Sequence, residues 1–170
     1  MTPTAGTTFA TAGDDGIVIT RAVKAPRGLV FAALTQPAHL PHWLGRADWT
    51  MTVCHSDPRP GGVRRFVWRR DDGVEMGMNG VYLEVTPPDG LVCTEAYDGG
   101  PGDTVNTVRL TERDGTTTIT STIRYPTTQA RDAALATEMR AGAAESFARL
   151  SEHLQLTVNP AGPTAQGHHR

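Results

Sequence analysis

Residues 128–154, TQARDAALATEMRAGAAESFARLSEHL, decide which fold this chain can adopt. The stretch contains no proline and a single glycine, Gly142. Its larger apolar side chains recur at helical spacing and trace one stripe, with Ala143 between them: Leu135, Met139, Phe147, Leu150 and Leu154. The pattern predicts one amphipathic helix of about seven turns. Its apolar stripe needs a surface to pack against.

The chain before this helix has the pattern of strands joined by tight turns. The separators are rich in Asp, Gly and Pro, as in Pro87-Pro88-Asp89-Gly90 and Asp114-Gly115, which is typical of turns. Six consecutive strands with no helix between them predict an antiparallel meander. The predicted strands are Trp49–His55, Gly62–Arg70, Glu75–Thr86, Leu91–Tyr97, Val105–Glu112 and Thr116–Tyr125.

The N-terminal part adds one strand and two short helices. Ile17–Lys24 alternates between apolar and polar positions, which predicts a half-buried strand that Pro26 ends. Pro26 begins a short helix, and Pro37–Leu44, closed by Gly45, predicts a second one. A curved antiparallel sheet of about seven strands then wraps around the C-terminal helix in an α+β fold. Strong curvature leaves a gap between sheet and helix, which is a candidate ligand cavity.

Composition and charge indicate one globular domain. A length of 170 residues fits a single domain, with 38% hydrophobic and 20% charged residues. Residues 1–15 and 157–170 lack periodicity and predict disordered tails around a domain that spans 16–156. The net charge of −2 and the lack of a Lys/Arg cluster argue against nucleic acid as a partner.

The sequence predicts no metal or cofactor site, no membrane span and no signal peptide. Cys54 and Cys93 match no metal or redox spacing, and His39 and His42 lack an evident third ligand, so we expect no metal and no cofactor. No apolar run is long enough for a membrane span, and the N-terminus lacks the features of a signal peptide, which predicts a cytoplasmic protein. Two carboxylates on the outer face of the C-terminal helix, Glu138 and Glu145, are expected to be solvated.

The alternation of residues along the strands indicates which side chains face the gap. Two charges, Arg64 and Glu95, fall in the inward register, and since burying an isolated charge is costly we predict that they pair. A shift of the strand register by one residue would instead put both charges in solvent. A stripe of aromatic and methionine side chains can also be part of an ordinary hydrophobic core that binds no ligand. The candidate ligand-binding residues are Trp43, Arg64, Phe66, Trp68, Met76, Met78, Tyr82, Glu95, Tyr97, Met139 and Phe147.

Four segments also carry a family resemblance: ITRAVKAPRGLVFAALTQPAHLPHWLG (19–45), DPRPGGVRRFVWRRDDG (57–73), GVYLEVTPPDGLVCTE (80–95) and RYPTTQARDAALATEMRAGAAESFARLSEHL (124–154). In this order they resemble the START-like, or SRPBCC, superfamily of helix-grip proteins. Within it they are similar to the family homologous to activators of the ninety-kilodalton heat-shock chaperone ATPase. The resemblance implies a sheet wrapped around a C-terminal helix with a hydrophobic ligand between them.

The same resemblance assigns positions to individual residues. It places Trp43, Phe66, Trp68 and Glu95 on positions of the family pattern. The chain departs from that pattern at three positions, which implies a larger cavity that is more polar at one end: His42, Arg64 and Ala143.

The sequence is compatible with three functions. The first is binding of a small hydrophobic molecule that is lipid-like, aromatic or polyketide-like. The second is a cyclase or aromatase in which Arg64, Glu95 or His42 polarises the substrate, although no nucleophile with an oriented base is evident. The third is a chaperone ATPase activator-like interaction module. We expect a monomer or a homodimer, since Ile17–Lys24 could pair as an edge strand unless its charges prevent it.

Overall fold

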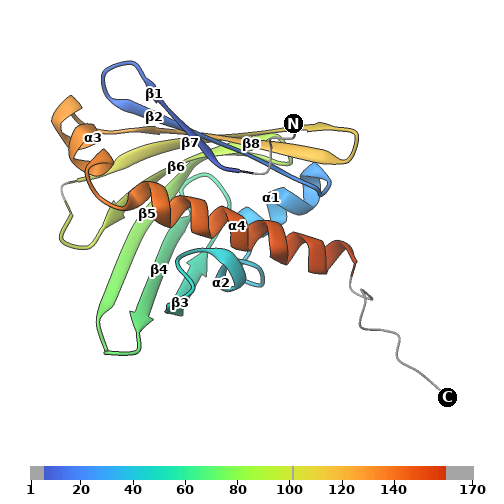
Figure 1. Ribbon diagram of the computed structural model, residues 1–170, viewed down its shortest axis with the longest axis horizontal. Coiled ribbons are helices and arrows are strands. Elements are labelled where there is room, and N and C mark those ends of the chain that lie inside the picture. The colour runs from blue at the N-terminus through green and yellow to red at the C-terminus, as the bar shows by residue number, and fades with distance from the viewer. Residues whose placement is uncertain (1–5, 101, 160–170) are drawn as a thin grey trace.

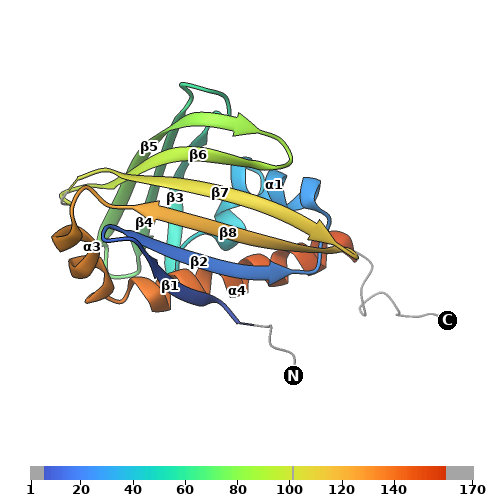
Figure 2. The same cartoon turned by 90° about the horizontal axis from the view of Figure 1, so that it is seen from above.

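A single antiparallel sheet wraps around a long helix in the computed structural model, which describes residues 6–100 and 102–159 (Figures 1 and 2). The strand order is β1-β2-β8-β7-β6-β5-β4-β3. The predicted α+β helix-grip fold is confirmed, with eight strands in place of about seven. The strands are β1 (Thr8–Ala12), β2 (Gly16–Val23), β3 (Trp49–Ser56), β4 (Val63–Arg70), β5 (Glu75–Thr86), β6 (Gly90–Tyr97), β7 (Thr104–Arg113) and β8 (Thr116–Arg124).

Two short helices connect β2 to β3, as predicted. They are α1 (Arg27–Thr35), which follows Pro26, and α2 (Leu40–Trp43). The indole Nε1 of Trp43 donates a hydrogen bond to the carbonyl oxygen of Ala33 at 2.8 Å, and this bond holds α2 against α1. Figure 1 shows α2 lying beside the C-terminal helix. No helix in the described ranges is long and apolar enough to cross a membrane.

The expectation of a disordered N-terminal tail is wrong for residues 8–12. β1 pairs with β2 in antiparallel register, with Phe9 opposite Ile19. The composition of this segment is poor in apolar residues, but the edge of β2 offers unpaired backbone groups that a neighbouring strand satisfies. β2 is therefore not the sheet edge that the sequence suggested for a dimer. Residues 1–5 of the predicted tail lie outside the described residues.

The predicted C-terminal helix is interrupted near its start. The structure has α3 (Thr128–Leu135) and α4 (Met139–Val158) in place of one helix over 128–154. Thr137 Oγ1 donates to the carbonyl oxygen of Ala134 and accepts from the amide of Met139, and such local bonds compete with the helical ladder. α4 continues past residue 156, while residues 160–170 of the predicted tail lie outside the described part.

The hydrophobic core occupies only one end of the space between sheet and helix. In the second half of α4, Leu150 and Leu154 are fully buried and pack with α1, α2 and the sheet. The first half of α4 presents Gly142 and Ala143 toward the sheet, and these short side chains do not fill the distance to it. The small residues at this end leave the cavity described next.

Candidate functional site

A cavity of about 970 Å³ lies between the inner face of the sheet and the helices α3 and α4. Its volume falls at the upper end of the range for small-molecule sites. Small residues of the two helices make the space, because their side chains stop short of the sheet: Ala130, Ala133, Ala134, Gly142 and Ala143. A Cβ atom added at Gly142 would meet no other atom within 4 Å. The cavity is open space, not a small packing defect.

Most of the candidate ligand-binding residues line this cavity. The lining includes Trp43, Arg64, Trp68, Met76, Met78, Glu95, Tyr97, Met139 and Phe147. Phe66 and Tyr82 do not belong to it, since both are buried in the core behind the lining. The hydroxyl of Tyr82 forms a hydrogen bond with that of Ser56 at 2.6 Å, so its polar end faces away from any ligand. These two residues support the cavity wall.

Arg64 and Glu95 form the ion pair that the sequence predicts. Arg64 Nη1 lies 3.3 Å from Glu95 Oε2, and the side chains are 9% and 21% exposed. The guanidinium carbon lies 5.3 Å and 5.4 Å from the ring centroids of Phe66 and Tyr82. This arrangement places the positive charge between two aromatic rings and a carboxylate, which favours the charged form.

A glycine makes room for this ion pair. Gly80 on β5 lies opposite Arg64 in the sheet register. A Cβ atom there would overlap the carbonyl oxygen of Thr94 on β6 and would lie 3.5 Å from Arg64 Nη1. Because Gly80 has no side chain, β5 and β6 approach closely and Arg64 reaches across β5 to Glu95.

The ionisable groups around the pair are held in defined states. Burial is the largest single effect and disfavours the charge on Arg64, but Glu95, Cys93 and Tyr82 together outweigh it and raise the pKa of the guanidinium. Burial raises the pKa of the Cys93 thiol to about 12, so this cysteine stays protonated and is not an activated nucleophile. Burial, followed by the charge of Glu95, also raises the pKa of Tyr125. The polar end of the cavity therefore combines one balanced ion pair with neutral donors.

Tyr97 belongs to the same polar end. Half of its surface is exposed, and the side chain lines the cavity. Burial, followed by the charge of Glu95, raises the pKa of its phenol. Tyr97 is therefore a neutral hydroxyl group that the cavity can offer to a ligand.

Sequence reasoning missed the contribution of β7 and β8 to the cavity. These strands, with the residue that follows β8, add four polar side chains to the lining: Thr104, Asn106, Ser121 and Tyr125. Asn106 is buried, and its Oδ1 has no hydrogen-bond partner among the residues that the structure describes. The signal was present in the sequence, because Asn106 alternates with the apolar Val108 and Leu110 on one face of a strand.

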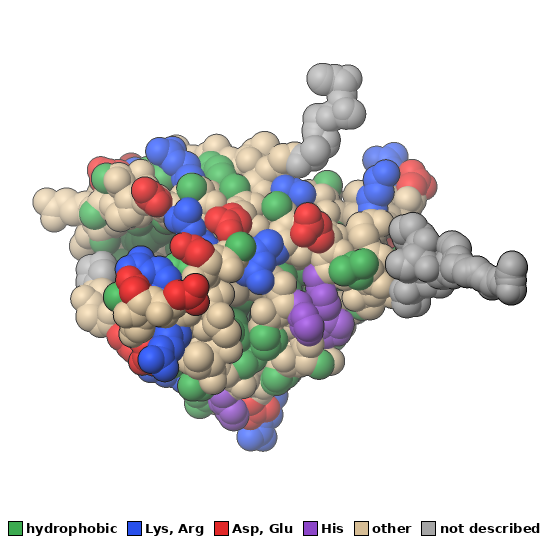
Figure 3. Space-filling model, turned by 60° about the horizontal axis from the view of Figure 1, so that its bottom comes forward, with side chains coloured by type: hydrophobic (Ala, Val, Ile, Leu, Met, Phe, Trp, Pro, Cys, Tyr) green, Lys and Arg blue, Asp and Glu red, His purple; other side chains and the backbone are tan. Residues whose placement is uncertain are grey.

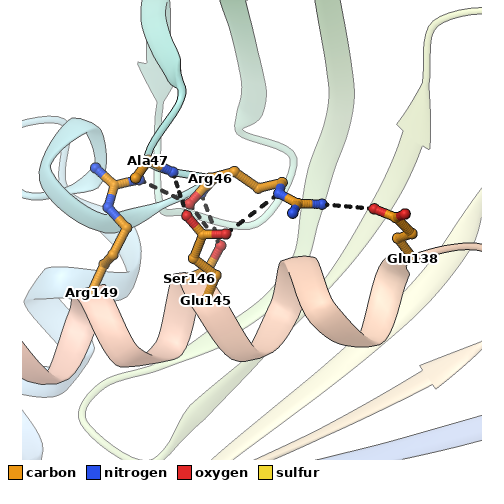
Figure 4. Close-up of polar contacts among 7 residues, drawn as sticks. Arg46, Ala47, Glu138, Glu145, Ser146 and Arg149 are labelled. Atoms are coloured by element: carbon orange, nitrogen blue, oxygen red, sulfur yellow. Dashed lines mark hydrogen bonds and ion pairs between the residues drawn. The ribbon is translucent and has the colours of Figure 1, made fainter.

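The rim of the cavity is tied to α4 by a network around residues 45–47 (Figure 4). Arg46 Nη1 lies 3.2 Å from Glu138 Oε1, and Arg46 Nε lies 3.4 Å from Glu145 Oε1. The amide of Ala47 donates to Glu145 Oε2 at 2.6 Å. The expectation that both carboxylates are solvated is wrong for Glu145, because the loop before β3 folds back onto α4 and leaves its side chain 34% exposed. Glu138 pairs with Arg46 but remains 82% exposed, as expected.

A second set of bonds fixes the same loop from its other side. The hydroxyl of Ser146 accepts from the amide of Gly45 at 3.0 Å and donates to its carbonyl at 3.1 Å. Arg149 Nη1 donates to the same carbonyl at 2.8 Å (Figure 4). Trp68 Nε1 donates to the carbonyl of Leu44 at 3.0 Å. The loop is thereby bonded both to the helix and to the sheet, and it borders the cavity between them.

The family model described as Activator of Hsp90 ATPase homolog 1-like protein matches residues 24–155. The chain belongs to this family. The matched range includes the cavity-lining strands β4 to β8 and the lining part of α4, so most of the cavity is built from the part of the chain that the family model covers. β1 lies outside the matched range. No curated protein matches the chain.

Solved structures show the same architecture. A protein from Rhodobacter sphaeroides is 32% identical, with a TM-score of 0.85 over 88% of this chain and 98% of that chain. A protein from Mycobacterium smegmatis is 22% identical, with a TM-score of 0.79 over 89% of this chain and 99% of that one. DynU16, a putative protein in the dynemicin biosynthetic locus, is 22% identical, with a TM-score of 0.64 over 84% of this chain and 48% of that chain. The last two likenesses show the fold alone.

This member of the activator-homologue family also carries a histidine cluster where α2 meets α4. His39 Nδ1 lies 2.8 Å from His153 Nε2, and the ring of His42 stacks on that of His153 at 5.0 Å. Figure 3 shows histidine side chains gathered on one face of the molecule. His153 supplies the third histidine that the sequence did not reveal, yet among the described residues no group of three His, Cys, Asp or Glu is placed to hold a metal ion.

The cluster predicts a loss of stability in mild acid. Burial lowers the pKa of His153, and the charges of His39 and His42 lower it further. The unfolded chain binds this proton near the ordinary histidine pKa of about 6.5, whereas the folded chain binds it only at lower pH. The contribution of His153 to stability is therefore fully present above the ordinary histidine pKa and is lost as the pH falls through its folded pKa.

The measurement is the melting temperature of wild type and variants between pH 8 and pH 5. We expect His153→Gln to flatten the decline that begins near the ordinary histidine pKa, about 6.5. His55→Gln changes an exposed histidine on β3 away from the cluster and should keep the wild-type profile. Parallel profiles for wild type and His153→Gln would show that the cluster does not control this pH dependence.

Proposed function

We propose that this protein binds a small hydrophobic ligand in the cavity between the sheet and α4. The cavity volume of about 970 Å³ carries this proposal. Protein interiors pack with few voids larger than a water molecule, so a space of this size is not an ordinary core defect. A lipid-like, aromatic or polyketide-like molecule of this size fits the space.

The lining supports an apolar ligand with one polar end. Trp43, Trp68, Met78 and Phe147 supply apolar surface, while the ion pair and its neutral neighbours gather on β4, β6, β7 and β8. Apolar walls with a few convergent polar groups are the usual composition of small-molecule sites. The family resemblance favours the same function, since members of the superfamily hold hydrophobic ligands between sheet and helix.

The experiment uses N-phenyl-1-naphthylamine, an uncharged probe that fluoresces in apolar surroundings. We expect wild type to bind it and the double variant Ala134→Trp/Ala143→Trp to bind at least tenfold more weakly, since two indole rings would occupy the space. The matched control, Ala141→Trp/Ala148→Trp, adds the same two rings at exposed helical positions and should bind like wild type. Equal binding by both double variants would place the probe outside the cavity.

Failure of wild type to bind any hydrophobic probe would contradict the proposal. It would favour the third function, a protein-interaction module related to chaperone ATPase activators. Native mass spectrometry of protein from its own host provides a second, independent measurement. A mass that falls by that of one apolar molecule on denaturation would support the proposal and would reveal the chemical class of the ligand.

A cyclase or aromatase is the second candidate. Arg64 and Glu95 form a charged pair inside the cavity, and such a pair can polarise a bound carbonyl group. DynU16, whose locus is that of dynemicin biosynthesis, shares the fold. The test is to incubate a linear polyketide mimic with wild type and with Glu95→Gln and to follow loss of water by mass spectrometry. Equal product with both proteins would argue against catalysis by Glu95, and product with neither protein would argue against a cyclase or aromatase.

A further inference from the structure

The short helix α2 connects the histidine cluster to the cavity. His39, which precedes the helix, and His42 within it both contact His153 on α4. Leu40 and Trp43, which directly follow these two histidines in the sequence, are buried and line the cavity. One short segment therefore presents two histidines to α4 and two apolar side chains to the cavity.

The contact between His39 and His153 limits the number of protons that the two rings can carry. Nδ1 of His39 lies 2.8 Å from Nε2 of His153, so one nitrogen donates a hydrogen bond and the other accepts it. In two imidazolium rings both nitrogens carry a proton, and neither can accept. Protonation of both rings therefore breaks this hydrogen bond and leaves two positive charges facing each other.

The residues on α4 do not offset this repulsion. Arg149 reaches the cluster from α4, where its Nη2 donates to the carbonyl oxygen of His42 at 3.2 Å, and it adds a further positive charge. Glu152 precedes His153 in the sequence, and it is exposed. Within the described residues, no ion pair joins an Asp or Glu to a histidine of the cluster.

The other elements near the cluster add no negative charge. α1, β2 and β3 pack against α2 or α4, and none of the three contains Asp or Glu. α3 lies at the other end of α4 (Figure 1). The charged or titratable residues of α1, β2 and β3 are Arg27, Arg21, Cys54 and His55. Protons added to the cluster therefore meet only neutral or positive groups on these elements.

Separation of α2 from α4 would open the wall of the cavity. The ring of Trp43 stacks on that of Phe147 on α4, with the ring centroids 6.2 Å apart, and both side chains line the cavity. Phe147 precedes His153 by about two turns of the same helix. Loss of the histidine contact would loosen this aromatic contact and admit water to a space that an apolar ligand needs dry.

We propose that the histidine cluster makes ligand binding depend on pH, so that the cavity holds its ligand at neutral pH and releases it in mild acid. The inference rests on the proposed binding function and adds its regulation. The closed wall is compatible with fewer protons than the open one, so ligand and protons oppose each other's binding. Ligand affinity is therefore complete above the ordinary histidine pKa of about 6.5 and declines as the pH falls below it.

The experiment titrates the protein with N-phenyl-1-naphthylamine at pH 7.5 and pH 5.5. The probe is uncharged at both values, and carboxyl groups ordinarily titrate lower, at about pH 4. We expect the dissociation constant of wild type to rise about tenfold at pH 5.5. His153→Gln keeps a hydrogen-bonding side chain but binds no proton, so its dissociation constant should change by no more than about twofold. His39→Gln, which removes the other partner, should behave in the same way.

The matched control is His55→Gln, which changes an exposed histidine on β3 away from the cluster and should respond to pH like wild type. Calorimetry at pH 6 in two buffers of different ionisation enthalpy counts the protons that probe binding releases. Wild type should release protons, and His153→Gln should release fewer.

Three results would overturn the proposal: equal probe affinity of wild type at both pH values, a wild-type pH response in His153→Gln, or loss of the far-ultraviolet circular dichroism of wild type at pH 5.5. The last result would mean that acid unfolds the whole domain and does not open the cavity wall. Absence of probe binding at pH 7.5 would instead contradict the binding function, and this inference with it.

Discussion

Glu95→Leu is expected to lower the free energy of unfolding by about 3 kcal/mol. Stability falls because the side chain of Arg64, which is 9% exposed, would keep its positive charge with no carboxylate beside it. This value is the lower end of the stability loss expected when one partner of a buried ion pair is removed, since Glu95 borders an open cavity that water can enter. Urea denaturation of both proteins gives the difference directly.

The double variant Arg64→Met/Glu95→Leu is the control for this prediction. It removes both charges, and buried pairs can often be replaced by apolar residues with little loss of stability. We expect it to recover most of the stability that Glu95→Leu loses, which would appear as a coupling between the two sites in a double-mutant cycle. If Glu95→Leu were as stable as wild type, the ion pair would contribute nothing to the stability of the fold.

Gly80→Ala is the second change with a large expected effect, roughly 3 kcal/mol of lost stability. The added Cβ would overlap the carbonyl oxygen of Thr94, a backbone atom that cannot move without separating β5 from β6. The added Cβ makes only ordinary contact with Arg64 Nη1, but displacement of β6 would move Glu95 away from Arg64, so the ion pair should also be disturbed. Thermal and urea denaturation measure the loss, and a weakened response to Glu95→Leu in the Gly80→Ala background would report the disturbed pair.

Gly142→Ala provides the matched control. Gly142 lies within α4 at an ordinary helical position, and a Cβ there meets no atom within 4 Å. Alanine favours a helix over glycine by up to about 1 kcal/mol, so this variant should be more stable than wild type. If both glycine variants changed stability in the same direction, close approach of β5 and β6 would not be the reason that Gly80 is required.

Periodic patterns in the sequence were sufficient for the element order and for much of the inner face. Alternation along β4 and β6 placed Arg64 and Glu95 on the side of the sheet that faces α4, and the cost of burying a lone charge predicted their pairing. The same alternation did not show that Phe66 and Tyr82 lie behind the lining. Periodicity indicates only which face of the sheet a side chain points to. Whether that side chain reaches the cavity depends on the residues that cover it.

Local cues also failed where a distant segment supplies the partner. β1 has little apolar character of its own, and it forms because β2 offers it an unpaired edge. The break between α3 and α4 depends on the side chain of Thr137, which competes with backbone bonds in a stretch that is otherwise typical of one helix. Neither feature has a signature in the hydrophobic pattern.

The sequence by itself determined the curved sheet, the helix that it wraps, the inward register and the family. Only the tertiary structure decided that Glu145 binds the loop at Ala47, that His153 joins His39, and that Asn106 Oδ1 is buried without a partner in the described part of the chain. The physical reason is the separation along the sequence of the residues that interact. Periodicity and turn residues act over a few positions, whereas these contacts join residues about a hundred positions apart, and a missing contact can be recognised only when every neighbour is in place.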